Sequence, residues 1–189
     1  MNPIIVAGPA VEPVTLAGMK AYLRLDGDEE DDLVEALVTA ARITVEGHGR
    51  LALIEQTWRL RLDRWPDDRC LRLPIHPVLA IDAIRVSEHG GSAVVLAPDG
   101  YRLGEQGDVT WLAAAPTPMP AGDPPLIEID FTCGFGPDPS AVPEPLILAV
   151  RRLAAFWFEH RGDEPAADSP GLPAGIAALI APFAHRRLA

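Results

Sequence analysis

The hydrophobic pattern of this chain changes its period twice, and this limits the folds that it can adopt. Between about residues 29 and 46, apolar side chains recur every three or four positions, which is typical of an amphipathic helix. From Glu55 onward apolar and polar residues alternate, as in QTWRLRL, which is typical of a half-buried strand. After residue 143 the helical spacing returns. This order predicts an α+β fold.

Two helices are expected before residue 50. The first residues, Pro3 to Pro13, hold three prolines and few packing signals, so they predict a flexible arm. Thr15 is a suitable N-cap for a first helix, which Asp26-Gly27-Asp28 breaks. A second helix is expected from about Glu29 to Glu46, ended by Gly47 and Gly49.

The middle of the chain predicts a small antiparallel β unit. Short runs with strand character follow one another, separated by turn signals such as Pro98-Asp99-Gly100. After the strand at about residue 58, the expected strands are Cys70–Leu73, Ile81–Val86, Ala93–Leu96, Tyr101–Leu103, Val109–Leu112 and Leu126–Phe131. The segment from Ala113 to Pro125 holds five prolines and is expected to be a surface loop.

Two further helices are expected at the C-terminal end. Pro145 fits the first turn of a helix that stops near Gly162. A linker from Asp163 to Pro173 then leads to a short helix in which Pro182 is expected to produce a kink or an early end. The predicted organisation is therefore a helical bundle from residues 1–54 and 134–189, with the arm at its start and a docking segment at its end. A β-rich unit from residues 55–133 is inserted between its halves.

Charge and composition exclude several classes of protein. A formal net charge of −11 has the wrong sign for gripping nucleic acid, so a DNA-binding module is disfavoured. Cys70 and Cys133 share no short motif, which argues against a disulfide framework or a zinc site. No stretch approaches the roughly 18 apolar residues of a membrane span.

The residues give few signs of catalysis. The chain has no phosphate-binding glycine loop, no HExxH and no Gly-x-Ser-x-Gly. The histidines lie apart, near predicted turns and helix ends. We therefore expect no enzyme activity, no catalytic metal and no cofactor. The alternative is a small hydrolase-like enzyme whose site is assembled from scattered residues.

Seven short segments, in order along nearly the whole chain, resemble one known family. They are EPVTL at 12–16 with LRLD at 23–26, the helix 33–41, ALI at 52–54 with QTWRL at 56–60 and DRWP at 63–66, LP at 73–74 with PV at 77–78, FTCGFG at 131–136 with VPEPL at 142–146, WFEHR at 157–161, and LP at 172–173 with LIAPF at 179–183. Together they resemble the head–tail connector (adaptor) proteins of tailed phages, including the adaptors of gene transfer agents.

The resemblance implies a structural role. Such proteins form a ring, expected to be a dodecamer, beneath the portal protein of a filled head. The ring extends the DNA channel and docks the next tail component, a stopper or tail terminator. DNA passes through without specific binding, and no membrane is involved. The expected location is the neck of a phage-like particle assembled in the bacterial cytoplasm.

Two sets of residues are candidates for this role. Acidic residues at the start of the second helix are channel-lining candidates: Asp28, Glu29, Glu30, Asp31 and Asp32. Their other explanation is stabilisation of a helix N-terminus, where the helix dipole favours negative charge. The portal-docking candidates lie in the last segment: Ile176, Leu179, Ile180, Phe183, Arg186 and Arg187. The alternative for the apolar members is burial in the chain's own bundle, since so short a helix must cover that face.

Overall fold

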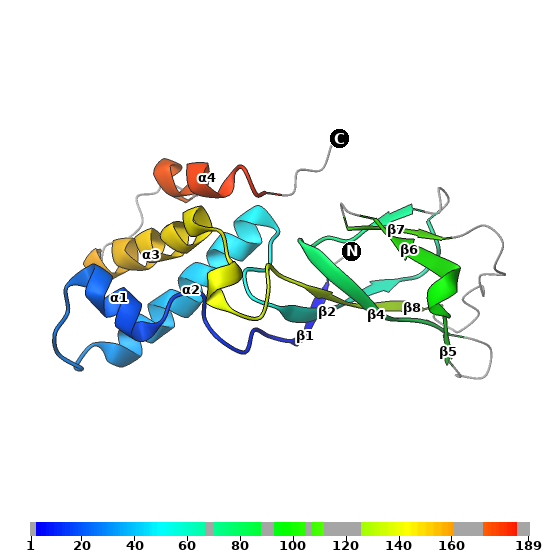
Figure 1. Ribbon diagram of the computed structural model, residues 1–189, viewed down its shortest axis with the longest axis horizontal. Helices are drawn as coiled ribbons and strands as arrows, with labels where there is room; N and C mark the ends of the chain where they lie inside the picture. Colours follow the sequence, from blue (N-terminus) through cyan, green and yellow to red (C-terminus); the bar gives the residue numbers. More distant parts are fainter. Residues whose placement is uncertain are drawn as a thin grey trace. The chain divides into compact units, whose positions relative to one another are not determined.

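The computed structural model describes residues 3–66, 70–87, 93–104, 107–111, 126–160 and 172–184. The chain divides into two units (Figure 1). Residues 1–8 and 55–134 form the β unit, and residues 9–54 and 135–189 form the helical unit. Each unit is therefore assembled from two segments that are far apart in the sequence.

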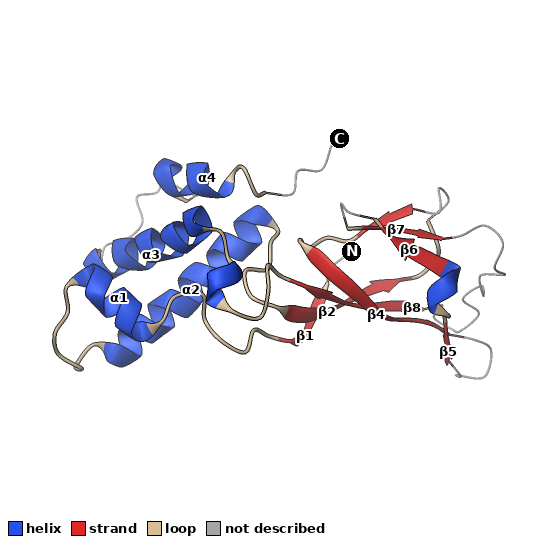
Figure 2. Cartoon of the chain, viewed as in Figure 1, coloured by secondary structure: helices blue, strands red, loops and turns tan. Residues whose placement is uncertain are grey.

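The helical unit contains the four helices expected from the sequence (Figure 2). They are α1 (Leu16–Leu23), α2 (Asp31–Gly49), α3 (Glu144–Glu159) and α4 (Ala174–Ile180), with a short 3-10 turn at Pro139–Ala141 before α3. Thr15 caps α1 as predicted, because its hydroxyl accepts a hydrogen bond of 3.1 Å from the Gly18 backbone N–H. The prediction of two helices before residue 50 and two after residue 143 is confirmed for the described residues.

Two helices end on residues that the sequence did not suggest. Arg24 follows α1 with φ 59°, and Arg50 follows α2 with φ 54°, so both adopt the left-handed conformation. The Arg50 backbone N–H donates to the Glu46 carbonyl and closes the last turn. The glycines at 47 and 49 were expected to perform this function, but both lie inside α2. Helix α4 ends at Ile180, ahead of Pro182, which confirms the expected shortening.

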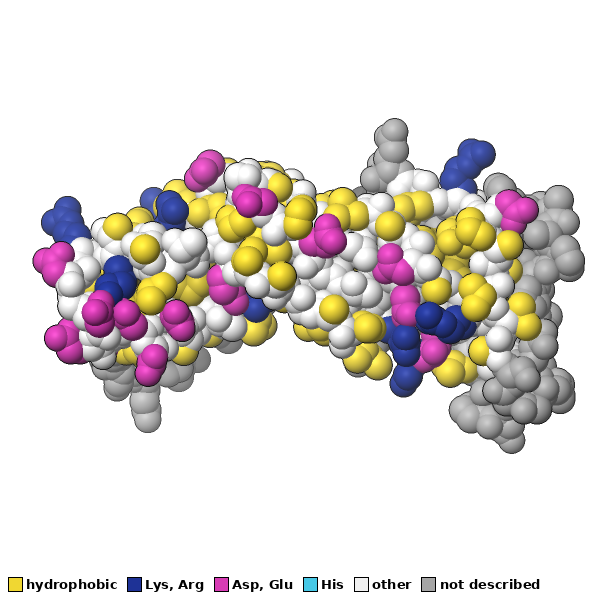
Figure 3. Space-filling model, turned by 60° about the horizontal axis from the view of Figure 1, so that its bottom comes forward, with side chains coloured by type: hydrophobic (Ala, Val, Ile, Leu, Met, Phe, Trp, Pro, Cys, Tyr) yellow, Lys and Arg dark blue, Asp and Glu magenta, His cyan; other side chains and the backbone are white. Residues whose placement is uncertain are grey.

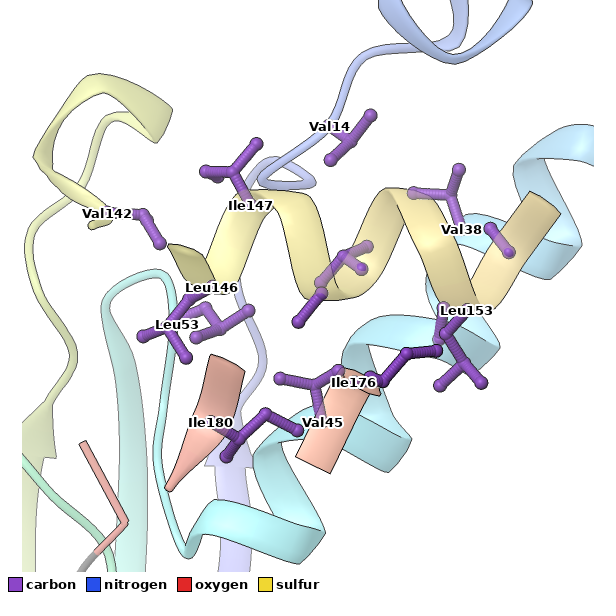
Figure 4. Close-up of a cluster of buried hydrophobic side chains, with 14 of the residues drawn as sticks. Val14, Val38, Val45, Leu53, Val142, Leu146, Ile147, Leu153, Ile176 and Ile180 are labelled. Atoms are coloured by element: carbon purple, nitrogen blue, oxygen red, sulfur yellow. The ribbon is translucent and has the colours of Figure 1, made fainter. Parts of the chain in front are cut away.

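A single hydrophobic core holds the helical unit together. Helices α2 and α3 provide most of it, through side chains such as Val38, Val45 and Leu153 (Figure 4). Burial of each aliphatic side chain of this size stabilises the fold by about 1.5–3 kcal/mol. Ile176 and Ile180 of α4 belong to the same core. The last helix is thus part of the folded unit.

The β unit consists of two antiparallel sheets. Its strands are β1 (Ile4–Ala7), β2 (Gln56–Leu62), β3 (Cys70–Arg72), β4 (Val78–Ser87), β5 (Ala93–Val95), β6 (Tyr101–Leu103), β7 (Asp108–Trp111) and β8 (Ile127–Cys133), with a 3-10 turn at Pro98–Gly100. The larger sheet has the order β1-β2-β8-β4-β5 and the smaller one β3-β7-β6. The predicted strands after residue 55 are confirmed, whereas the loop expected from Ala113 to Pro125 lies outside the described residues.

The two faces of the larger sheet differ because its strands alternate apolar and polar residues. In the β2–β8 ladder, Leu60 lies opposite Ile129, and both are fully buried. On the other face Arg59 lies opposite Asp130. The alternation found in the sequence therefore gives one apolar face and one charged face.

The N-terminal residues differ from the prediction. The sequence indicated a flexible arm, but Ile4–Ala7 forms β1 and pairs with Thr57, Trp58 and Arg59 of β2. A run of four apolar residues between prolines has no alternation to reveal a strand. The pairing depends on β2, which lies about fifty residues later in the sequence.

Candidate functional site

The acidic residues at the start of α2 are tied to α1 by one lysine. Lys20 Nζ lies 2.7 Å from an oxygen of Asp28 and 2.7 Å from an oxygen of Asp31. These hydrogen bonds hold the pKa of Lys20 above its ordinary value and the pKa of Asp28 below it. Asp31 and Asp32 also occupy the first turn of α2, where negative charge is favourable.

The remaining acidic residues leave this region strongly negative. Glu29 and Asp32 are exposed, and a single lysine stands against the five carboxylates of residues 28–32. In Figure 3, acidic side chains gather on the helical unit. Part of the cluster thus stabilises the α1–α2 connection, while Glu29 and Asp32 present negative charge to solvent.

The apolar stripe of the last helix is largely covered by its own unit. Ile176 is 4% exposed and Ile180 is fully buried, beside Val45 and Leu53 in Figure 4. Leu179 and Phe183 are partly buried against the same core, and the Phe183 ring meets that of Phe135 edge-on at 6.4 Å between centroids. Arg186 and Arg187 lie outside the described residues.

A buried ion network fastens the segment before α1 to α2. Arg42 donates from Nε to Glu12 and from Nη1 to Glu46, at 2.8 Å each. Glu46 also accepts from the Leu53 backbone N–H, and Glu12 accepts from the Thr39 hydroxyl. Burial opposes the charged guanidinium, but the two carboxylates outweigh it and keep the pKa of Arg42 above its ordinary value. The network therefore fixes three separate stretches of the helical unit.

An open groove of about 480 Å³ lies beside this network. The groove is lined by residues of the segment 11–16, by Glu35, Val38 and Thr39 of α2, and by Pro139. Its lining is mainly apolar, and Val11 is substantially exposed there. The groove places the Thr39 hydroxyl beside the Glu12 carboxylate, but that carboxylate is also paired with Arg42, which makes it a weak base. The open, mainly apolar lining suits contact with another surface.

A ladder of ion pairs covers the polar face of the larger sheet. Asp130 of β8 accepts from Arg59 on both carboxylate oxygens, at 2.6 Å and 2.9 Å, and from Arg85 on one of them at 2.6 Å. Arg61 reaches the neighbouring Glu128 at 2.9 Å. The Arg59 hydrogen bond is the main reason why the pKa of Asp130 lies below its ordinary value, with support from Arg85. In Figure 3, basic and acidic side chains gather together on the β unit.

The described residues offer little for metal or membrane binding. They contain no group of three or more histidine, cysteine, aspartate or glutamate side chains placed to hold a metal ion. His76 is buried and bonds to the Leu73 carbonyl, while His160 bonds to that of Phe156. None of the helices in the described part of the chain is both long enough and apolar enough to cross a bilayer.

Known structures resemble this chain over its full length. A chain from the neck of an empty gene transfer agent particle, computed with sixfold symmetry, is 31% identical, with 100% of this chain and 98% of that chain covered and a TM-score of 0.85. A chain from the virion of a native gene transfer agent is 32% identical over the same shares, with a TM-score of 0.82. The chain belongs to the head–tail connector family. A third family member, from the neck of a native particle computed with twelvefold symmetry, is 31% identical with a TM-score of 0.82 and the same coverage. No protein-family model and no curated protein matches the sequence.

Sequence reasoning identified some of these features and missed others. It identified the acidic residues and the terminal helix, which lie in separate parts of the helical unit. It missed the Arg42 network, because Glu12 is thirty residues from Arg42 in the sequence. The ion-pair ladder had a usable signal: arginines at 59 and 61 and acids at 128 and 130 occupy the polar positions of two alternating strands.

Proposed function

We propose that this protein is a structural subunit of the neck of a gene transfer agent or tailed-phage particle. The observation that carries the proposal is the full-length similarity to gene transfer agent neck components, at 31% identity and a TM-score of 0.85. In this role the chain forms a ring beneath the portal protein, extends the DNA channel and docks the next tail component. The family resemblance in the sequence supports the same arrangement.

The symmetry of the related structures supports ring formation. Those necks were computed with sixfold and twelvefold symmetry. A ring of identical subunits needs two different complementary surfaces on each copy, repeated around the axis. We propose a ring of twelve copies, in which each subunit contributes the same face to the central channel.

The role needs no covalent reaction. Two of the similar chains come from the necks of gene transfer agent particles, which supports a structural function. In the described helical unit, the groove beside Glu12 is lined mainly by apolar side chains. Repeated interfaces and a smooth channel are sufficient for the proposed task.

The exposed acidic residues at the start of α2 are proposed to line the channel. Repeated negative charge repels phosphate, so DNA neither binds nor stalls. Glu29→Lys with Asp32→Lys should slow DNA delivery at least tenfold while particles still assemble, because the Lys20 pairs with Asp28 and Asp31 remain. Glu55→Lys with Asp63→Lys, which makes the same charge change at two exposed acidic positions of the β unit, is the matched control. Normal DNA delivery by the double variant would remove these residues from the channel.

The C-terminal segment is proposed to contact the portal protein. Ile176 and Ile180 are buried, so the contact must use Leu179, Phe183 and the basic residues that follow, with the two isoleucines holding α4 in place. Charge reversal of Arg186 and Arg187 to glutamate should abolish attachment to DNA-filled heads without unfolding the protein. Arg152→Glu, at an exposed position on α3, is the control. Full attachment of the double variant would contradict this docking proposal.

The function itself is tested by locating the protein in particles. A tagged full-length chain should co-purify with particles, and density for it should form a ring between head and tail. Deletion of its gene should give DNA-filled heads without tails. Normal tailed particles from the deletion strain would overturn the proposal.

A further inference from the structure

The larger sheet of the β unit ends in an exposed apolar strand at each edge. Strand β1 lies at one end of the order β1-β2-β8-β4-β5, and β5 lies at the other. Among the described strands, each has a single neighbour in the sheet, so its outer backbone N–H and C=O groups face no strand. Such edges readily pair with another chain.

Strand β1 carries none of the side chains that usually protect an edge. Its sequence is IIVA, all four residues are exposed, and Ile5 has 52% of its surface accessible. It contains no charged residue and no proline, and its single register shift lies between Ile5 and Ala7. An apolar edge of this kind is costly to leave in water and marks a contact site.

Strand β5 has the same character at the opposite edge. Its sequence is AVV, all three residues are exposed, and Val95 is 61% accessible. It pairs with Arg85, Val86 and Ser87 of β4, and a hydrogen bond from Leu96 N–H to the Ile84 carbonyl extends this pairing by one step.

The first half of β4 is a poorer alternative to β5. It extends beyond the reach of β5, so its outer edge is also uncovered by the described strands. However, its pairing with β8 shifts register twice, between Val78 and Ala80 and between Ile81 and Ala83. Two such irregularities within its first six residues make this edge less regular than that of β1, whose pairing shifts register once, and they oppose strand addition.

The strand directions suit a ring. Four antiparallel steps separate β1 from β5, so the two edge strands run in the same direction. A twelvefold axis rotates one copy onto the next by only about 30°. Consequently β5 of one copy and β1 of the next would run roughly parallel, which is a permitted ladder geometry.

We infer that β1 of each subunit pairs in parallel with β5 of the neighbouring subunit, so that the larger sheets join around the ring. This inference rests on the proposed ring and names one of its interfaces. Each copy supplies one edge of each kind, which is what a head-to-tail interface requires. Closure of the ring covers the outer edges of β1 and β5 in every copy.

Cross-linking tests the pairing directly. All variants carry Cys70→Ser, so that the remaining native cysteine is the buried Cys133. Full-length protein with Ile5→Cys and Val94→Cys is assembled into rings or particles and treated with a short bismaleimide. We expect a ladder of covalent oligomers on a denaturing gel. The single-cysteine variants should give at most dimers, and Ile43→Cys with Val94→Cys, which pairs β5 with an exposed site on α2, should give no ladder.

Edge-blocking substitutions give a second measurement. Ile5→Lys and Val94→Lys should each lower the yield of rings at least tenfold, whereas Leu79→Lys, on the irregular half of β4, should leave it within twofold of the unmodified protein. Circular dichroism confirms that each variant is folded.

The outcomes separate this inference from the proposed function. Rings or particles that contain the protein but give no ladder would show that the edges do not pair, while the connector role stands. A cross-link to a different protein would assign β1 or β5 to that partner and overturn the inference. Absence of the chain from both rings and particles would remove the proposed function and the inference together.

Discussion

Ile180 packs against the α-carbon of Gly49. A β-carbon at position 49 would lie 3.0 Å from Ile180 Cγ2 and 2.7 Å from Leu51 Cδ1. Helix α4 thus approaches the end of α2 so closely that an added β-carbon would displace the side-chain ends of Leu51 and Ile180. This close approach explains why a helix of seven residues can be held firmly in the core.

The two glycines of α2 should therefore respond in opposite directions to alanine. Gly49→Ala should lower the free energy of unfolding by about 1–3 kcal/mol, because overpacking displaces Leu51 and Ile180. Gly47→Ala is the matched control, since a β-carbon there meets nothing within 4 Å. It should raise the free energy of unfolding by up to about 1 kcal/mol through helix propensity. Urea denaturation measures both, and equal effects would contradict the close packing of α4.

Asp130 should make stability depend on pH in the acid range. Its folded pKa lies below the ordinary value of 3.8, mainly through the Arg59 hydrogen bond. The stabilisation is therefore present above the unfolded pKa and is lost as the pH falls through the folded pKa. Asp130→Asn should lose about 3 kcal/mol at neutral pH and show a flatter acid limb.

Thermal melts across the acid range measure the Asp130 effect. Asp63→Asn, which removes an exposed carboxylate outside the ladder, is the control and should keep the acid limb of the unmodified protein. The explanation fails if Asp130→Asn loses stability equally at all pH values.

The side chains of the Arg42 network should be energetically coupled, so that substitutions in it are not additive. Arg42→Ala leaves Glu46 buried beside an empty space, so it should cost about 3–5 kcal/mol. Glu12→Gln should cost less, because Glu46 still neutralises the guanidinium. A double-mutant cycle with Arg42→Ala and Glu12→Gln should give a coupling energy above about 1 kcal/mol. Additive effects would show that the two side chains act independently.

Replacing Arg50 by glycine should stabilise the protein. Its left-handed conformation costs a residue with a β-carbon about 1 kcal/mol, which glycine avoids. Arg50→Gly should raise the free energy of unfolding by about that amount. Arg50→Ala removes the same charged group but keeps the β-carbon, so it should give no gain. A stabilising alanine would assign the effect to charge instead of backbone conformation.

Much of this fold could be predicted from periodicity. The spacing of apolar residues located all four helices and every described strand after residue 55. Local patterns could not reveal β1, because its pairing with Trp58 is a tertiary contact. They also could not show that Arg50, and not Gly47 or Gly49, would adopt the left-handed conformation at the end of α2.

The candidate site was less accessible to sequence reasoning. An arginine and a glutamate four residues apart, such as Arg42 and Glu46, usually form an exposed pair on a helix. Here the segment around Glu12 covers both side chains, and no local sequence pattern indicates this burial. The acidic run at residues 28–32 was visible, but its partner Lys20 lies on the preceding helix.

The interleaving of the two units has a consequence for synthesis on the ribosome. All described strands of the β unit have been translated once residue 134 has emerged, because its segments are 1–8 and 55–134. The helical unit must wait for α3 and α4, so α1 and α2 leave the exit tunnel with their apolar faces uncovered. Folding during translation therefore completes the inserted unit first. Chaperones must then shield the apolar faces of α1 and α2 until the last helix is released.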